Sequence, residues 1–350
     1  MTLSMMPIST IRLKRSFPNS PPVTRQMKYY TIHHHTRYRY SSEVSESTME
    51  VRMQPRTDRQ QRCLNFRLEV WPHAQVLATS DCLQNAIHYF DIPRSHSELL
   101  LRAQTLVMVQ ESEPLPESLE SSEWKALGEV AATGHHWDWL TPSRFARPTP
   151  LLSDFAEEIG FGQDQDPLTA LFNLNERIHA AIEYTPKSTA VDSPIDTALD
   201  NRRGVCQDFS HIMIALLRKA GIPARYISGY VFLDPERKKE KEISGASHAW
   251  VEAFLPTTGW IGLDPTNNSA VSDKHIRIAV GRDYADVPPT RGTYKGNARS
   301  ELTVGVHISE TEDEDIPHDL LDNGHVTTRE LVEAESSTRL RLEQEQQQQQ

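Results

Sequence analysis

The sequence has few cysteines and no long apolar run. Its 350 residues include 3 cysteines, too few for a disulfide framework in a chain of this length. No apolar run approaches the roughly 20 residues that a membrane-spanning helix needs. Acidic residues exceed basic ones, giving a formal net charge of −11, whereas nucleic-acid binding needs a basic surface. We therefore expect a cytoplasmic protein with reduced thiols and neither a nucleic-acid nor a membrane partner.

The two ends of the chain differ in composition from its middle. Residues 1–42 contain no Asp or Glu, and an organellar transit peptide is one interpretation of such a start. We favour another, because Met27 opens a segment typical of strands: residues 1–26 are then a disordered leader or a mis-assigned start. Residues 310–350 are acidic and Gln-rich, which predicts a disordered tail.

Residues 27–110 predict an all-β sandwich domain. Short runs of aromatic and β-branched residues alternate with Pro, Asp and Ser turns, as in antiparallel sandwiches. One run alternates so that its apolar residues are expected on one face of a strand: Leu64, Phe66, Leu68 and Val70. The consecutive histidines 33–35 would alternate across a strand and cannot converge on one ion, so we expect no metal there.

A linker and packing segment is predicted for residues 111–165, because it begins with an acidic stretch rich in Pro and Ser. Helix is expected to resume with Asp166 as the N-cap and Pro167 in the first turn. The core domain is predicted to span residues 166–309.

Cys206 lies at the predicted start of a buried helix. The residues after it carry apolar side chains at helical spacing as far as Ala220, and Gly221 and Pro223 form a stop signal. A helix N-terminus favours the thiolate, which is the nucleophilic form of cysteine. Its unpaired backbone N–H is a candidate oxyanion donor, and Gly204 is interpreted as leaving room for a substrate. The alternative is an inert structural cysteine.

His248 and Asp264 fall at the two ends of a predicted β-hairpin. Residues 248–255 alternate, a Pro- and Gly-containing turn follows, and residues 260–264 form the returning strand. An antiparallel hairpin brings its ends together, so the imidazole and the carboxylate are expected to meet. This pair is what a nucleophilic cysteine requires: a base, and a group that orients the base.

These motifs resemble the transglutaminase-like superfamily, and its bacterial branch in particular. The similarity rests on the segments RGVCQDFSH, SHAWVEAF and GWIGLDPT, and it extends over roughly residues 27–309. It implies an α+β fold: a papain-like core, with the cysteine helix on an antiparallel sheet, preceded by a β-sandwich. It also implies that Cys206 is the nucleophile, His248 the general acid/base and Asp264 the orienting carboxylate. The remaining Cys and His residues show no metal-ligand spacing, so we expect no cofactor or metal. Gln207 stands where crosslinking transglutaminases carry Trp, which argues against crosslinking.

The expected activity is cysteine-dependent acyl transfer on peptide or protein amide bonds through a thioester. We rank hydrolysis first, because an intracellular crosslinking enzyme without a pro-segment would endanger its host. Transglutaminase activity with an amine acceptor and a non-catalytic peptide-binding scaffold are the alternatives.

Four further residues near these motifs have weaker predicted roles. Arg203 is interpreted as a solvated loop residue rather than a substrate ligand, and Asp208 is expected to face away from Cys206. Tyr184 and Trp250 are expected either to line the cleft or to pack beside it.

Overall fold

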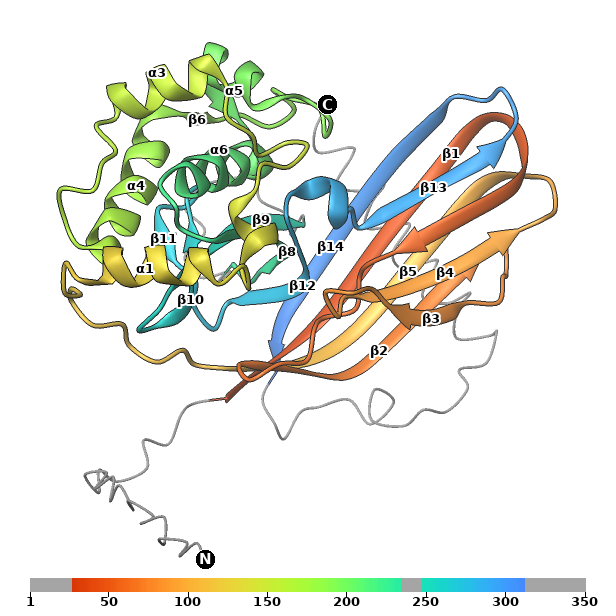
Figure 1. Ribbon diagram of the computed structural model, residues 1–350. Coiled ribbons are helices and arrows are strands. Elements are labelled where there is room, and N and C mark those ends of the chain that lie inside the picture. Colours follow the sequence, from red (N-terminus) through yellow and green to blue (C-terminus); the bar gives the residue numbers. More distant parts are fainter. Residues whose placement is uncertain (1–26, 234–246, 312–350) are drawn as a thin grey trace, which may run out of the picture.

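The computed structural model describes residues 27–233 and 247–311. The predicted leader and almost all of the predicted tail lie outside these ranges. The described residues form a mainly-β region beside an α+β core (Figure 1).

Seven strands of the described residues make up the mainly-β region: β1 (Met27–Val51), β2 (Gln61–Trp71), β3 (Leu77–Ser80), β4 (Ala86–Ile92), β5 (His96–Gln110), β13 (Thr290–Lys295) and β14 (Ser300–Thr311). β1 bends near Glu46, which has a positive φ of 51°. Its first half pairs with β5 and β14, and its second half pairs with β4 and β13. Buried side chains from both halves form one hydrophobic cluster.

The last two strands differ from the predicted division of the chain. Residues 290–309 were expected to belong to the core domain. β13 and β14 instead pair with β1, so the chain returns to the sheet where it began. Such long-range pairing leaves no local signal in a sequence, because the residue pattern of a strand does not indicate which other strand it pairs with.

Leu64 is also placed differently from the prediction. Phe66, Leu68 and Val70 pack against the sandwich cluster as expected, but Leu64 is 37% exposed. The pairing register of β2 with β5 shifts between Cys63 and Asn65. This β-bulge turns Leu64 out of the alternation.

In the described part of the core, there are six helices and seven strands. The helices are α1 (Glu123–Ala132), α2 (Trp137–Leu140), α3 (Pro150–Glu158), α4 (Pro167–Ala181), α5 (Ile195–Asn201) and α6 (Cys206–Lys219). The strands are β6 (Glu183–Tyr184), β7 (Arg203–Gly204), β8 (Ala224–Val231), β9 (His248–Leu255), β10 (Gly259–Asp264), β11 (Ser269–Ala270) and β12 (His275–Gly281), and a 3-10 turn, η2 (Tyr284–Asp286), follows β12.

A five-stranded antiparallel sheet in the order β11-β10-β9-β8-β12 forms the centre of the core. α6 packs on β8 and β9, and α2, α3, α4 and α5 contact α6 (Figure 1). α4 begins as predicted, since the Asp166 carboxylate accepts hydrogen bonds from the N–H groups of Leu168 and Thr169. α6 ends before Gly221, which has a positive φ of 81°.

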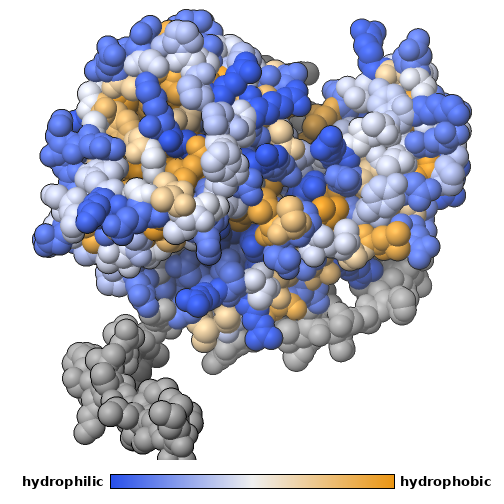
Figure 2. Space-filling view, viewed as in Figure 1, coloured by the Kyte–Doolittle hydropathy of each residue, from blue (hydrophilic) through white to orange (hydrophobic). Residues whose placement is uncertain are grey.

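The mainly-β region and the core share one hydrophobic cluster. Tyr30 and Ile32 of β1 belong to the same buried set as α6 and β8, and His34 of β1 is hydrogen-bonded to the Tyr230 hydroxyl of β8 at 2.6 Å. Figure 2 shows a mostly hydrophilic surface with apolar residues in small groups, some along the junction. Among residues 27–233 and 247–311, no helix is long and apolar enough to cross a membrane.

Candidate active site

Cys206 opens α6, the central helix of the core. The turn before it is held by Asp208, whose carboxylate accepts the backbone N–H of Val205 at 2.8 Å and the hydroxyl of Thr189 at 2.6 Å. An acid that accepts the N-cap N–H is half of a capping box, and it fixes the direction in which the chain enters the helix. Cys206 itself is half-buried.

Gly204 has a different role from the one predicted. A Cβ placed there would come within 2.9 Å of the Asp208 Cβ and 3.0 Å of its Oδ2. The missing side chain therefore makes room for the capping carboxylate, rather than for a substrate. The sequence could not distinguish these two uses of a glycine.

His248 and Asp264 are brought together by the β9–β10 hairpin. Leu263 pairs with Val251, so the next position of β10, Asp264, lies opposite Trp250 of β9. His248 precedes Trp250 by two residues, and its side chain therefore lies on the same face of the sheet as that of Asp264. His248 Nε2 lies 2.7 Å from Asp264 Oδ2. The predicted meeting of imidazole and carboxylate is present in the structure.

The Asp264 carboxylate is fully buried and surrounded by donors. Oδ1 accepts the backbone N–H groups of Thr266 and Asn267 at 3.0 and 3.2 Å. Oδ2 accepts the side-chain amide of Asn267 at 2.7 Å, His248 at 2.7 Å and His275 at 3.5 Å. So many donors stabilise the ionised form.

The two partners of this pair have opposite pKa shifts. Burial lowers the pKa of His248, but hydrogen bonds to Asp264 and Cys206 and the charges of both outweigh it and raise that pKa to about 10. Burial raises the pKa of Asp264, whereas hydrogen bonds from His248, His275 and Asn267 bring it far below its usual range. Near neutral pH the pair is an imidazolium facing a carboxylate.

His248 also connects Asp264 to Cys206. Its ring is hydrogen-bonded to the Cys206 side chain. Because Nε2 is on Asp264, Nδ1 is the nitrogen available to the thiol. The structure thus places the predicted side chains in the order sulfur, imidazole, carboxylate. This arrangement can transfer a proton between sulfur and imidazole while the carboxylate holds the ring.

The residues with weaker predicted roles differ in where they lie: two are exposed near the site and one is buried in the protein core. Tyr184 is 43% exposed. Partial burial is the larger cause of its raised pKa, and the charge of the nearby Cys206 is the smaller one. Tyr184 therefore lies at the rim of the site. Arg203 is exposed and paired with Glu183 at 2.9 Å. Trp250 is completely buried and packs against His248, with ring centroids 6.2 Å apart, so it does not line a cleft.

Three further contacts near the site escaped the sequence analysis. Tyr284 of η2 is hydrogen-bonded to the Gln207 side chain, and its backbone N–H donates to His211 Nε2 at 3.2 Å. His275 reaches Asp264 from β12. Tyr284 and His275 are far from Cys206 in the sequence, and β9 and β8 lie between β10 and β12 in the sheet. Only the tertiary fold brings these groups close.

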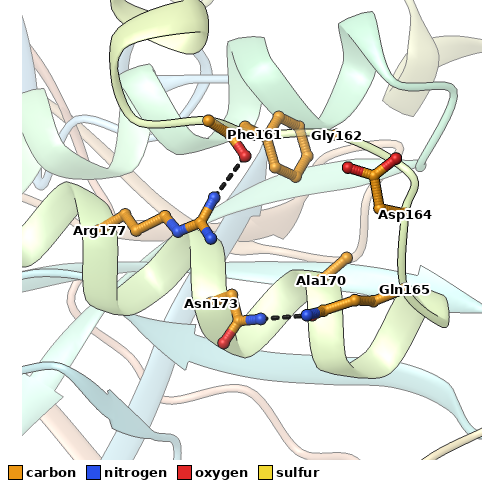
Figure 3. Close-up of a pocket in the computed structure, with 8 residues that line it drawn as sticks. Phe161, Gly162, Asp164, Gln165, Ala170, Asn173 and Arg177 are labelled. Atoms are coloured by element: carbon orange, nitrogen blue, oxygen red, sulfur yellow. Dashed lines mark hydrogen bonds between the residues drawn. The ribbon is translucent and has the colours of Figure 1, made fainter.

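A small pocket between α4 and the loop before it takes no part in this arrangement (Figure 3). Its lining includes Phe161, Asp164 and Asn173, and Arg177 donates to the carbonyl of Ile159 at 2.8 Å. None of the predicted site residues lines it.

Two family models match this chain. The family model described as the transglutaminase-like superfamily matches residues 153–265, a range that contains Cys206, His248 and Asp264. A second model, the bacterial transglutaminase-like N-terminal region, matches residues 30–108. The chain belongs to the transglutaminase-like superfamily. The recognition and the α+β fold class predicted from the sequence are therefore confirmed.

Similar proteins cover most of the chain. The uncharacterized protein ML0607 of Mycobacterium leprae is 32% identical over 276 residues, which span 79% of this chain and 96% of that protein. A Mycobacterium tuberculosis protein, Rv2569c, is 33% identical over 294 residues, or 80% and 92% of the two chains.

Two other similar proteins are named as enzymes of different kinds. The crystal structure of a candidate cysteine protease from Cytophaga hutchinsonii superposes with a TM-score of 0.65 at 24% identity, covering 82% of this chain and 92% of that one. It shares the fold. A Protein-glutamine gamma-glutamyltransferase of Pseudomonas aeruginosa is 31% identical over 156 residues, which cover 42% of this chain and 23% of that protein.

Proposed function

We propose that this protein is a cysteine-dependent enzyme that cleaves peptide or protein amide bonds through a thioester. The observation that carries the proposal is the continuous contact from the Cys206 sulfur through the His248 imidazole to the buried Asp264 carboxylate. A structural cysteine would need neither partner, and a histidine held only for stability would not need a carboxylate that five donors orient.

The first half-reaction forms the acyl-enzyme. The Cys206 thiolate attacks the amide carbonyl carbon, and a C–S bond forms as the carbonyl oxygen takes the negative charge. The first-turn N–H of α6 at Cys206, which the helix itself does not pair, is a donor for that oxyanion. Collapse of the tetrahedral intermediate breaks the C–N bond, and His248 gives its proton to the departing amine.

The second half-reaction releases the acyl group. Water attacks the thioester carbonyl while His248 takes a proton from it, and the C–S bond breaks to return the thiolate. Asp264 keeps the imidazole oriented through both steps.

We favour water over an amine as the acceptor. Water reaches a half-exposed thiol without a site of its own, whereas an amine acceptor needs a second binding site to compete with solvent. The similarity to a Protein-glutamine gamma-glutamyltransferase supports the second candidate, transfer of the acyl group to an amine. Both share the thioester and differ only in what resolves it.

One assay separates the two acceptors. Casein is incubated with the protein and with dansylcadaverine, and mass spectrometry measures new peptide termini and deamidated glutamines against dansyl adducts. Hydrolysis predicts cleaved or deamidated product at all amine concentrations, while transfer predicts adducts that rise with the amine. The matched control for Cys206→Ala is Cys82→Ala, because Cys82 is exposed and outside the site.

The expected result is that Cys206→Ala abolishes product and Cys82→Ala leaves it unchanged. Equal product from both variants would remove the enzyme proposal. Tight binding of casein peptides by the wild type and by Cys206→Ala, with no covalent product from either, would instead favour a peptide-binding scaffold.

A further inference from the structure

His275 is a second histidine on the Asp264 carboxylate. It opens β12 at the far edge of the central sheet, and its Nε2 lies 3.5 Å from Asp264 Oδ2. The side chain is 6% exposed and Asp264 is 0% exposed, so bulk water cannot replace this donor. Among the described residues, His248 and His275 are the titratable groups that are hydrogen-bonded to Asp264.

The backbone fixes the tautomer of His275. The N–H of Ser272 donates to His275 Nδ1 at 3.1 Å, and the N–H of His275 donates to the Ser272 carbonyl at 3.0 Å. A backbone N–H can only donate, so Nδ1 is the acceptor of the ring. The ring proton is then on Nε2, the nitrogen that faces Asp264.

Trp250 lies against both histidines and limits how their rings can move. Its ring is 6.2 Å from that of His248 at an interplanar angle of 29°, and 5.3 Å from that of His275 at 77°. Gly229 leaves the space that the Trp250 ring occupies, because a Cβ there would come within 2.4 Å of the ring. The imidazoles and the indole therefore form one packed unit around the carboxylate.

We propose that His275 is a positioning residue, which donates a hydrogen bond from Nε2–H to Asp264 and thereby holds that carboxylate against His248. This inference rests on the proposed function. A neutral donor adds no charge that would compete with the His248 imidazolium. It favours the ionised carboxylate, and the ionised carboxylate favours the imidazolium that faces the Cys206 thiolate.

Two substitutions separate this role from simple packing. His275→Phe keeps an aromatic ring against Trp250 but removes the donor. His275→Gln loses the ring but keeps an amide N–H at about the position of Nε2. A packing role predicts that Phe is tolerated and Gln is damaging, whereas a positioning role predicts the reverse for cysteine reactivity.

The measurement is the rate of iodoacetamide labelling of Cys206 between pH 5.5 and 9, by mass spectrometry, in the full chain. We expect His275→Phe to label about fivefold more slowly at pH 6.5, which is less than the roughly tenfold loss expected when the imidazolium itself is removed, because the lost hydrogen bond acts on the thiol only through Asp264 and His248. The rate should recover as the pH rises, and His275→Gln should stay within about twofold of the wild type. Labelling of His275→Phe at the wild-type rate, or slow labelling of Gln alone, would overturn the inference.

A measurement on the wild type keeps the inference testable if both variants fail to fold. Long-range ¹⁵N–¹H spectra of the His275 ring should show the Nε2–H tautomer, and a ring protonated on Nδ1 instead would contradict the inference. His248→Ala serves as the reference for the function itself. Slow labelling of His248→Ala with normal labelling of His275→Phe would contradict only the role of His275. A wild-type Cys206 that labels as an ordinary thiol would contradict both that role and the proposed function.

Discussion

Replacing His248 by Ala tests the charge arrangement on which the proposed chemistry depends. In the folded protein, burial lowers the pKa of His248, but Asp264 and Cys206 together raise it to about 10. The ring is therefore protonated at pH 6.5 and can face a thiolate. Without the imidazolium, Cys206 loses the cationic partner that would favour its ionised form.

The expected size of the effect follows from thiol chemistry. A free thiol titrates near 8.5, so only about 1% of it is thiolate at pH 6.5, and a complete ion pair would raise that fraction about a hundredfold. A thiolate of lower pKa is also a weaker nucleophile, and a decrease of about 2 pKa units removes roughly tenfold of this gain in rate. We expect His248→Ala to label with iodoacetamide about tenfold more slowly at pH 6.5, to match the wild type at pH ~7.5 and to label faster than the wild type at pH ~9, where its free thiol is mostly ionised.

The assay is the labelling rate of each cysteine by mass spectrometry, with His135→Ala as the matched control because His135 is an exposed histidine outside the site. Cys82 of the same molecules gives an internal reference for an exposed thiol. If His248→Ala and the wild type label Cys206 equally fast at pH 6.5, the ion-pair reasoning is wrong.

The same pKa predicts how stability depends on pH. The pKa of His248 is higher in the folded protein, about 10, than its ordinary value of 6.5. Its stabilisation is therefore complete below pH 6.5 and is lost as the pH rises toward 10. The difference in melting temperature between the wild type and His248→Ala should shrink over that interval, and a constant difference would contradict the shift.

Two further substitutions test the scaffold. Gly229→Ala should destabilise the protein by about 1–3 kcal/mol in urea unfolding, because the new Cβ meets the Ile276 carbonyl at 2.3 Å and the Trp250 ring at 2.4 Å. Gly305→Ala is its control, since nothing lies within 4 Å of a Cβ there, and equal effects of the two would argue against the clash. Asp166→Ala should cost about 1–2 kcal/mol through loss of the α4 N-cap, and an unchanged unfolding midpoint would show that the cap is dispensable.

Several local elements could be predicted from the sequence because their signals are local. The apolar spacing after Cys206 and the Gly221 stop specify α6, and the alternation from His248 with a return ending at Asp264 specifies the hairpin. A hairpin has a short loop, so its register follows from residues close in the chain. This is why the contact between His248 and Asp264 could be predicted.

Other features depend on partners far away in the sequence. The bulge at Leu64, the Asp208 carboxylate beside Gly204 and the pairing of β13 and β14 with β1 each depend on a neighbour that no local pattern names.

The sequence by itself determined which residues could do chemistry, because nucleophile, base and orienting acid occur on elements with strong local signals. The tertiary structure alone decided what surrounds them. His275 reaches Asp264 from a strand at the opposite side of the sheet, Trp250 is packed between two imidazoles, and Gly229 leaves the space that this packing needs. Such contacts arise from the close packing of strands distant along the chain, and their distances are set by the whole core rather than by any segment of it.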